Sequence, residues 1–415
     1  MNSRLAGATS VSDIVQIGIV GLGAAGRAFL PAILAHPGFK LVAVAEPVAE
    51  VRADALAGHH ATGYSTMQAM LEHPGLDAVY IATPTNLHPE HALQAFAAGK
   101  HVLVEKPMAA QLDQARTMVT AAEQAEVVLL VGHSHSYDLP IQKMREIIAG
   151  GTLGCVRMVN TWCFTDWVYR PRRADEFDTN QGGGVTYRQG SHQFDIIRLL
   201  CGGMVRSVRA KTFNWDPQRS VIGAHIAYLD FVDGTAATAV YNGYGNFSSM
   251  DLGFNVSEWG FMQLLESRPS LRHSPADLTP EAELLAKQRR AKSAIPGSAP
   301  YQPFFGVTLV SCERGDIRQS PKGLYVYSEQ GQIEIELPTD RTPRDLVMAE
   351  FHDAITGRAR VVHDGRWGLA NLEVCAAAIS SSESGQDVLL KEQVALPVMA
   401  IKKLDDCDVR LQEKE

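Results

Sequence analysis

The chain has 415 residues, with 38 Lys and Arg against 46 Asp and Glu, and therefore a formal net charge of −8 at pH 7. This length corresponds to about two to three domains. Its 46% hydrophobic and 20% charged residues are typical of a globular protein and exclude the fibrous, collagenous and wholly disordered classes. Because nucleic-acid affinity comes mostly from Lys and Arg on phosphates, we expect no nucleic-acid partner for this acidic chain.

The first residues, Met1 to Asp13, contain one arginine and no apolar core, so they do not resemble a signal peptide. No run of about 18 uncharged apolar residues is long enough to cross a membrane. The 6 cysteines form no Cys-x-x-Cys pair. We therefore expect a cytoplasmic protein with reduced thiols and no membrane contact.

Between about residues 13 and 135, short apolar runs alternate with helical patterns. The predicted strands are Val15 to Val20, Leu41 to Ala45, Ala78 to Thr83, Val102 to Val104 and Val127 to Val131. Near-continuous apolar strands separated by helices indicate a parallel sheet with helices on both faces. We therefore expect an α/β dinucleotide-binding domain of the Rossmann type over residues 1–135.

Residues 136–415 show a different pattern. Four longer runs follow one another with little helix between them: Val156 to Phe164, Ser207 to Asn214, His225 to Val232 and Thr235 to Tyr241. Strands in succession favour an antiparallel sheet in an α+β domain. An insertion at about 267–303 contains the basic run Lys287 to Lys292, which we interpret as the solvated face of a short helix rather than a nucleic-acid patch. Helical patterns cover 189–200, 344–356 and 367–382.

A glycine motif follows the first predicted strand and opens a helix. It comprises Gly21, Leu22, Gly23, Ala24, Ala25 and Gly26. In this setting G-x-G-x-x-G indicates dinucleotide binding, since the glycines let the pyrophosphate approach the N–H groups of the helix N-terminus. Glu46, at the end of the second strand, would bind the ribose hydroxyls and repel a 2′-phosphate, which favours NAD over NADP. The alternative is that Glu46 is a surface carboxylate.

Further motifs give the chain a family resemblance. They are Ile81-Ala-Thr-Pro-Thr-Asn-Leu-His88, Glu105-Lys106-Pro107, Gly151 to Gly154, Gly182 to Gly184 with Gly190-Ser-His192 and Asp195, and the segment from Phe351 to Val388. At these residues the sequence resembles the glucose–fructose oxidoreductase and inositol dehydrogenase (Gfo/Idh/MocA) family. The resemblance implies a large, open, mainly antiparallel C-terminal sheet through which subunits associate as a dimer or tetramer. It also implies further cofactor-binding residues: Thr83, Pro84, Asn86, His88, Glu105 and Lys106.

Lys106 and His192 are the candidate catalytic residues. Hydride transfer from a carbinol carbon needs a base for the hydroxyl proton and a cation at the developing alkoxide. By motif position His192 fits the base, and Lys106 fits the cation or a proton relay that lies beside the nicotinamide. We expect no metal, because His88, His91, His133 and His135 have no carboxylate at a recognised ligand spacing.

Arg188 stands where the family usually has Asp, four residues before the histidine. A guanidinium group binds carboxylates with two parallel hydrogen bonds, so the departure predicts an acidic substrate. Upstream lies a second group of candidate substrate-binding residues: Tyr169, Arg170, Arg172 and Arg173. Nearby Asp175, Glu176 and Asp178 leave internal salt bridges open as the alternative. His135 is a further candidate, at a place where family members commonly have arginine.

These features predict an NAD-dependent dehydrogenase that oxidises a carboxylated cis-dihydrodiol. The sequence around His135, Arg172 and Arg188 is similar to the branch of the family that acts on phthalate-type cis-dihydrodiols. A sugar-acid or cyclitol dehydrogenase of the same family is one alternative. A non-enzymatic NAD-binding repressor or sensor is another, although it would need neither Lys106 nor His192.

Overall fold

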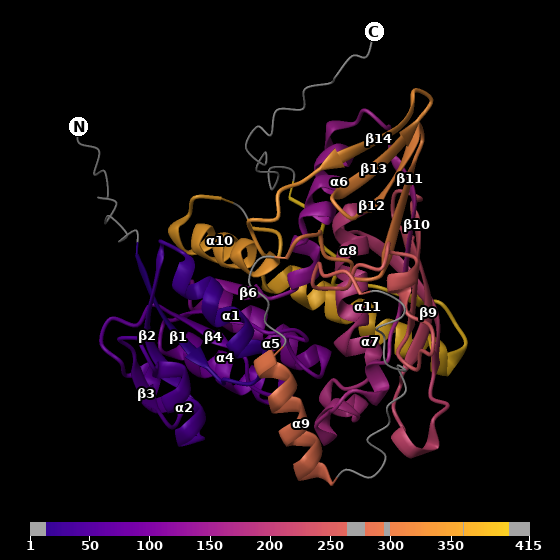
Figure 1. The fold of residues 1–415 in the computed structure, drawn as a ribbon. Helices are drawn as coiled ribbons and strands as arrows, with labels where there is room; N and C mark the ends of the chain where they lie inside the picture. Colours follow the sequence, from indigo (N-terminus) through magenta and orange to yellow (C-terminus); the bar gives the residue numbers. More distant parts are fainter. Residues whose placement is uncertain (1–13, 264–278, 294–298, 360, 398–415) are drawn as a thin grey trace, which may run out of the picture.

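The computed structural model describes residues 14–263, 279–293, 299–359 and 361–397, which form two sheets with helices around them (Figure 1). The first sheet has six parallel strands in the order β3-β2-β1-β4-β5-β6. Its strands are β1 (Val15–Val20), β2 (Phe39–Ala45), β3 (Thr62–Tyr64), β4 (Ala78–Ile81), β5 (His101–Val104) and β6 (Leu129–Val131). This confirms the predicted parallel sheet.

Helices cover both faces of this sheet. In sequence order they are α1 (Ala24–Ala35), α2 (Ala49–Leu56), α3 (Met67–Leu71), α4 (His88–Ala97) and α5 (Leu112–Gln124). Apolar side chains of α1 share a buried cluster with Ile17 and Ile19, whereas those of α4 and α5 pack in a second cluster with Val20. The alternation of strand side chains between two buried clusters explains the continuous apolar runs in the sequence.

The second sheet has nine strands in the order β14-β13-β12-β11-β7-β10-β9-β8-β15. Their bounds are β7 (Val156–Phe164), β8 (Val205–Phe213), β9 (Ala224–Phe231), β10 (Ala236–Asn242), β11 (Val307–Cys312), β12 (Gly315–Ser320), β13 (Gly323–Ser328), β14 (Gly331–Glu336) and β15 (Val388–Leu389). All neighbours are antiparallel except β7 and β10, which run parallel. The sheet is therefore mainly antiparallel, as predicted.

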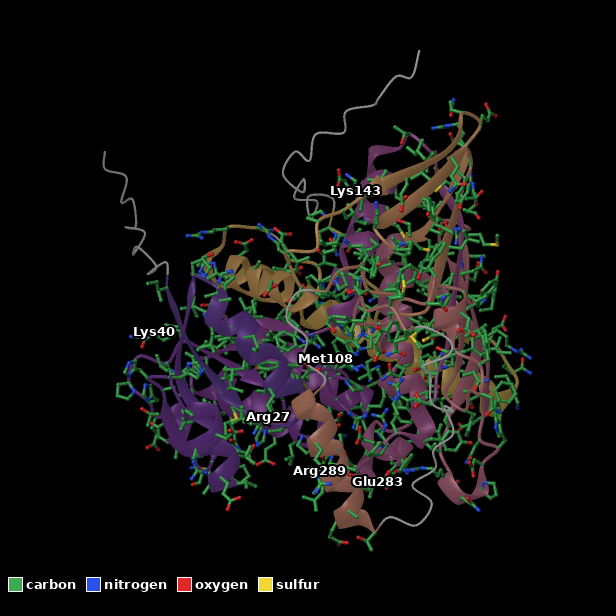
Figure 2. All side chains as sticks on the ribbon, in the orientation of Figure 1. Arg27, Lys40, Met108, Lys143, Glu283 and Arg289 are labelled. Carbon is green, nitrogen blue, oxygen red and sulfur yellow. The ribbon has the colours of Figure 1, made fainter. Side chains whose placement is uncertain are left out.

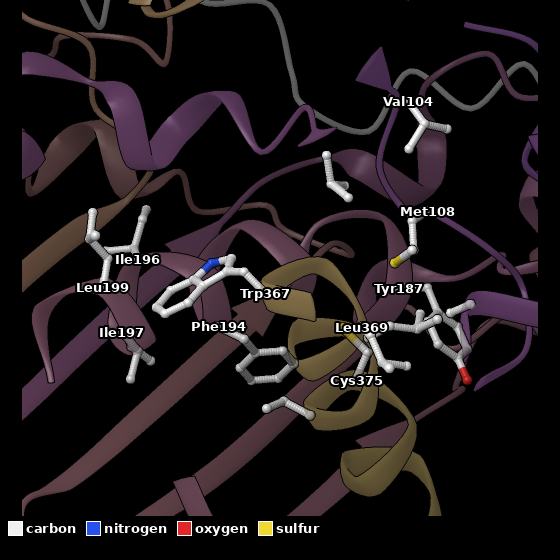
Figure 3. Close-up of a cluster of buried hydrophobic side chains, with 14 of the residues drawn as sticks. Val104, Met108, Tyr187, Phe194, Ile196, Ile197, Leu199, Trp367, Leu369 and Cys375 are labelled. Carbon is white, nitrogen blue, oxygen red and sulfur yellow. The ribbon is translucent and has the colours of Figure 1, made fainter. Parts of the chain in front are cut away.

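Helices of the second half pack on one face of this sheet (Figure 1). They are α6 (Leu139–Gly150), α7 (Val185–Arg188), α8 (Gly190–Leu200) and α11 (Gly365–Ser384). Figure 3 shows part of the core between them, where Phe194 of α8, Tyr187 of α7 and Trp367 of α11 belong to one buried cluster. Helix α10 (Pro343–Thr356) instead packs on α1 of the first half, since Val347 and Phe351 share the α1 cluster.

The predicted insertion contains helix α9 (Pro280–Ser293), while most of the rest of 267–303 lies outside the described residues. Glu283, labelled in Figure 2, pairs with Arg219, and Lys287 pairs with Glu176. The expectation that the whole basic run is a solvated face was therefore wrong at Lys287. The ion pair with Glu176 keeps the Lys287 side chain largely out of solvent, whereas Arg289 is exposed. No helix in the described ranges is long and apolar enough to span a bilayer.

Candidate active site

The glycine motif forms a tight loop between β1 and α1. Gly21 has φ +89°, a conformation that favours glycine, and a Cβ on Gly26 would lie 2.1 Å from the carbonyl oxygen of Gly21. A Cβ on Gly23 would meet nothing within 4 Å, so this residue faces open space. Helix α1 begins at Ala24 without a side-chain cap. The loop therefore leaves space and backbone N–H groups for a pyrophosphate, and the residues fit a dinucleotide.

Glu46 ends β2 and lies against this loop. Its Oε2 accepts a hydrogen bond of 2.9 Å from the backbone N–H of Leu22, and its Oε1 accepts one of 3.1 Å from Val48. The residue is 9% exposed, so the alternative of a surface carboxylate was wrong. Each oxygen still has acceptor capacity, because a carboxylate can accept about four hydrogen bonds. The carboxylate is thus held rigidly where strand β2 meets the glycine loop.

The loops after β4 and β5 are joined by a buried histidine. The ring nitrogens of His88 lie 2.9 Å from the carbonyl oxygens of Pro107 and Thr83. Burial lowers the pKa of His88 to about 4, so the neutral ring donates to one carbonyl at a time. His88 thus positions the two loops, and its predicted contact with the cofactor stays a prediction.

The other predicted cofactor residues lie on the same two loops. Pro84 caps the short 3₁₀ helix Thr85–Leu87, which contains Asn86, and Thr83 Oγ1 lies 3.1 Å from a ring nitrogen of His91. Glu105 accepts a hydrogen bond of 2.7 Å from the hydroxyl of Tyr80. All of them sit at the carboxyl edge of the parallel sheet, where dinucleotides bind in such folds.

Lys106 links this edge to the second half of the chain. Its Nζ donates a hydrogen bond of 2.8 Å to the backbone carbonyl oxygen of Arg188, 82 residues later in the sequence. Burial lowers the pKa of Lys106 to about 8, opposed by Glu105 and reinforced by the Arg188 charge. Lys106 is therefore mostly charged at pH 7 and loses its proton within the physiological to mildly alkaline range.

His192 lies in the first turn of α8 and is 4% exposed. Its Nδ1 is buried without a hydrogen-bond partner within the described residues. Burial, the Lys106 ammonium and neighbouring histidines lower the pKa of His192 well below its usual value. The ring is therefore neutral at pH 7.

His135 reaches the same place from the short helix Ser134–Tyr137. Its ring centroid lies 4.6 Å from that of His192, and it stacks on Phe305 at 4.3 Å. Its Nδ1 lies 3.1 Å from Asp138 Oδ2. The structure thus brings together Lys106, His192 and His135, three residues that the sequence placed in one site.

Arg188 has guanidinium donors at the site without hydrogen-bond partners in the described part of the chain. Its side chain is 14% exposed, and Nε and Nη2 are buried without a hydrogen bond. The nearest carboxylate oxygen, on Asp175, lies 3.5 Å from Nη2, beyond a good charge-assisted bond. Burial lowers the pKa of Arg188, against the attraction of Glu176 and Asp175.

The upstream arginines are paired within their own loop. Each guanidinium meets a nearby carboxylate: Arg170 with Asp166 at 2.6 Å, Arg172 with Glu176 at 3.4 Å and Arg173 with Asp175 at 2.8 Å. Tyr169 likewise donates a hydrogen bond of 2.9 Å to Asp216. The internal salt-bridge alternative therefore describes this loop, and direct substrate contact by these four residues stays a prediction.

A buried charge network behind His192 was not expected from the sequence. Asp195 accepts a hydrogen bond of 2.6 Å from Trp367 Nε1, and its other oxygen lies 3.5 Å from His363 Nε2. Burial disfavours a charged His363, but Asp195 and Glu350 outweigh it and raise the pKa of His363 to about 10. The network ties α8 to α10 and α11. Only the spacing of Asp195 from His192 gave a sequence signal for it.

Metal binding has no support at these histidines. Within the described ranges, no group of three or more His, Cys, Asp or Glu side chains could hold a metal ion. His133 instead accepts a hydrogen bond of 2.9 Å from the side-chain amide of Asn371. His133 is thus a buried residue whose hydrogen bond supports the fold.

A Rossmann sheet with an open glycine loop, and a buried lysine that joins its carboxyl edge to helix α7, are typical of an NAD-dependent oxidoreductase. The sequence model of the oxidoreductase family with an NAD-binding Rossmann fold matches residues 15–133, and the model of the corresponding C-terminal domain matches 141–254. The chain belongs to the Gfo/Idh/MocA family. Its cofactor is NAD, and the family model together with relatives named dehydrogenases makes the chain an oxidoreductase rather than a non-enzymatic repressor or sensor.

Relatives agree with this membership. A 1-carboxy-3-chloro-3,4-dihydroxycyclohexa-1,5-diene dehydrogenase from Comamonas testosteroni is 36% identical over 387 residues, covering 89% of this chain and 95% of its own. A solved dehydrogenase structure from Bordetella bronchiseptica RB50 has a TM-score of 0.84 at 37% identity, covering 91% of this chain and 100% of its own. The WlbA dehydrogenase from Bordetella pertussis, crystallised with NADH, has a TM-score of 0.68 at 22% identity, covering 91% and 98%. It shares the fold.

Proposed function

We propose that this oxidoreductase uses NAD to oxidise a carboxylated cis-dihydrodiol, and that its substrate is phthalate 4,5-cis-dihydrodiol, which becomes 4,5-dihydroxyphthalate. The observation that carries the proposal is the buried guanidinium of Arg188, with two donor nitrogens unbonded beside the Lys106 loop. A substrate carboxylate would satisfy those donors. The relative from Comamonas testosteroni, whose name specifies a carboxyl group and two hydroxyls on a cyclohexadiene ring, supports the same substrate class.

The chain's own residues divide the reaction between them. The glycine loop and Glu46 hold the dinucleotide, and Arg188 orients the substrate by its carboxylate. Neutral His192 accepts the hydroxyl proton, while the Lys106 ammonium stabilises the oxygen as it becomes negative. When bound, NAD supplies the hydride acceptor. The carbinol C–H and O–H bonds break, a C=O bond forms, and the ketone tautomerises to an aromatic diol.

The position of Glu46 predicts the cofactor preference. If its carboxylate binds the ribose hydroxyls, the wild type should bind NAD more tightly than NADP, and Glu46→Ala should narrow or reverse the difference, because a 2′-phosphate would no longer be repelled. Fluorescence titration with both cofactors measures this. Tighter binding of NADP by the wild type would contradict the assigned role.

The pKa of Lys106 predicts the pH profile. Since the charged form stabilises the alkoxide, kcat/KM for oxidation should fall as the pH rises through about 8, where Lys106 loses its proton. No limb near the usual histidine pKa is expected, because His192 is already neutral there. Lys106→Arg, which cannot lose its charge, should lack the fall. A wild-type rate that keeps rising above pH 8 would assign proton transfer to Lys106 instead.

The association and the location predicted from the sequence also stay proposals. The outer face of the nine-stranded sheet carries exposed large apolar residues on β7 and β9, namely Met158, Trp162, Ile226 and Tyr228. Exposed apolar patches of this kind mark protein interfaces, which supports a homo-oligomer through this sheet. We keep the cytoplasm as the expected compartment. The sugar-acid and cyclitol alternatives are separated from the proposal by an assay of NADH formation across both substrate classes.

A further inference from the structure

Arg344 is a second arginine at the site whose charge is not matched by a direct partner. It lies in the first turn of α10, with its guanidinium carbon 5.1 Å from the ring centroid of Trp259 and 5.7 Å from that of Phe29. Its Nε is fully buried and has no hydrogen-bond partner. Within the part of the chain that the structure describes, no carboxylate forms an ion pair with it. A buried donor of this kind is costly unless a ligand satisfies it.

Arg344 lines a cavity that extends to His135, the neighbour of catalytic His192. The cavity has a volume of about 70 Å³, and its walls include Arg344, Trp259, Asp138 and His135. The His135 ring lies 4.6 Å from the ring of His192. Burial and Lys106 lower the pKa of His192 most, and the charge of Arg344 adds to this effect. Arg344 therefore lines a cavity that is separated from His192 by the His135 ring.

The carboxylates around the cavity have other partners. Asp138 Oδ2 lies 3.1 Å from His135, and Glu258 lies 3.6 Å from Arg170. Asp138 attracts Arg344 electrostatically, but no hydrogen bond joins them. The buried Nε–H of Arg344 thus lacks a protein partner among the described residues and stays available to an anion.

We propose that Arg344 binds a second carboxylate of the substrate, so that the pocket holds a dicarboxylate between Arg344 and Arg188. The backbone carbonyl of Arg188 accepts a hydrogen bond from Lys106, and Arg344 lines the cavity beside His135, whose ring lies 4.6 Å from that of His192. Two separate guanidinium groups fit two adjacent carboxylates on one ring better than a single carboxylate. This inference rests on the proposed function and deepens it, because it separates dicarboxylated from monocarboxylated substrates.

Binding of phthalate and benzoate to the NAD-loaded protein tests the proposal without turnover. A charge-assisted hydrogen bond of about 1.5–3 kcal/mol corresponds to roughly ten- to a hundredfold in affinity. The wild type should therefore bind phthalate at least about tenfold more tightly than benzoate. Arg344→Met should remove most of that difference by weakening phthalate alone, and Arg344→Lys should restore part of it, since the charge remains but the planar fork is lost.

Arg341 supplies a matched control, because it is an exposed arginine on the same cavity wall. Arg341→Met should change phthalate affinity by less than about twofold, since solvent and salt screen an exposed charge. An equal loss in this variant would show a general charge effect and overturn the proposal. An equal loss of phthalate and benzoate in Arg344→Met would overturn it as well.

The cofactor provides the remaining check. Arg344→Met should bind NAD with wild-type affinity, and a matching loss of NAD affinity would assign Arg344 to the cofactor phosphates and overturn the substrate role. Arg344→Lys keeps the positive charge beside Trp259. Its thermal melt shows whether a loss of phthalate affinity in this variant comes from a loss of folding. If the wild type oxidises no carboxylated dihydrodiol, the proposed function fails, whereas the preference for phthalate over benzoate still decides the role of Arg344.

Discussion

Replacing His192 or Lys106 with alanine should lower kcat by about 10²-fold or more, the usual range for the loss of general acid–base catalysis. His192 offers an unpartnered, neutral ring nitrogen to the hydroxyl proton, and Lys106 is the buried cation at the same site. Both variants should still fold and bind NAD, because the glycine loop and Glu46, which carry most of the proposed dinucleotide contacts, are unchanged. Steady-state kinetics at saturating substrate and fluorescence titration of NAD measure the two properties.

Lys100 is a suitable control for the lysine variant. Its Nζ also donates a hydrogen bond to a backbone carbonyl, that of Leu76 at 2.7 Å, but it precedes β5 and so lies at the opposite edge of the parallel sheet. Lys100→Ala should keep kcat within about twofold, because removing a positive charge far from the reacting atoms changes little. Wild-type turnover in His192→Ala or Lys106→Ala would remove that residue from the mechanism.

Arg188→Ala should lower kcat/KM on a dicarboxylated dihydrodiol by roughly ten- to a hundredfold, the value of a buried charge-assisted hydrogen bond. Since Lys106 is bonded to the backbone carbonyl of Arg188, the alanine variant keeps that contact and the effect reports on the guanidinium. For an uncarboxylated analogue, which the wild type should already oxidise poorly, kcat/KM should fall much less in this variant. Steady-state kinetics on both substrates measures the difference.

The lysine variant separates charge from geometry at the same position. Arg188→Lys should recover only part of the activity, because lysine keeps the charge but cannot form two parallel hydrogen bonds. The loss in Arg188→Ala can exceed the contribution of the contact itself, since a bound carboxylate is left unpaired. Equal losses on carboxylated and uncarboxylated substrates would show that Arg188 supports the fold or the reacting hydroxyl, and would contradict carboxylate recognition.

The parallel sheet was predictable because its strands are buried on both faces and therefore read as continuous apolar runs. Strand β3 was missed, since Thr62–Tyr64 lies at the edge of the sheet and its residues are largely exposed. The parallel pairing of β7 with β10 was missed for another reason. Strand order in an open sheet depends on contacts between segments about 80 residues apart, and no local pattern records them.

At the site, the residues in motifs were predictable and their partners were not. The family resemblance selected Lys106, His192 and Arg188 by their positions in its motifs, and the structure brings Lys106 to the backbone of Arg188. Their electrostatic surroundings come from distant segments: the pairing of Lys287 with Glu176 joins α9 to the arginine-rich loop. Arg344 stands in a helix whose amphipathic pattern gives no sign of a ligand, and only folding brings it within range of His192.

The substrate class is decided by NADH formation with the purified protein and NAD across a panel of cis-dihydrodiols, sugar acids and cyclitols. Phthalate 4,5-cis-dihydrodiol should give the highest kcat/KM, a monocarboxylated dihydrodiol a lower value, and the sugar acids and cyclitols little turnover, because only the first satisfies a pocket with unbonded buried guanidinium groups. Highest kcat/KM on a sugar acid or a cyclitol, or equal values for carboxylated and uncarboxylated dihydrodiols, would contradict the proposed function.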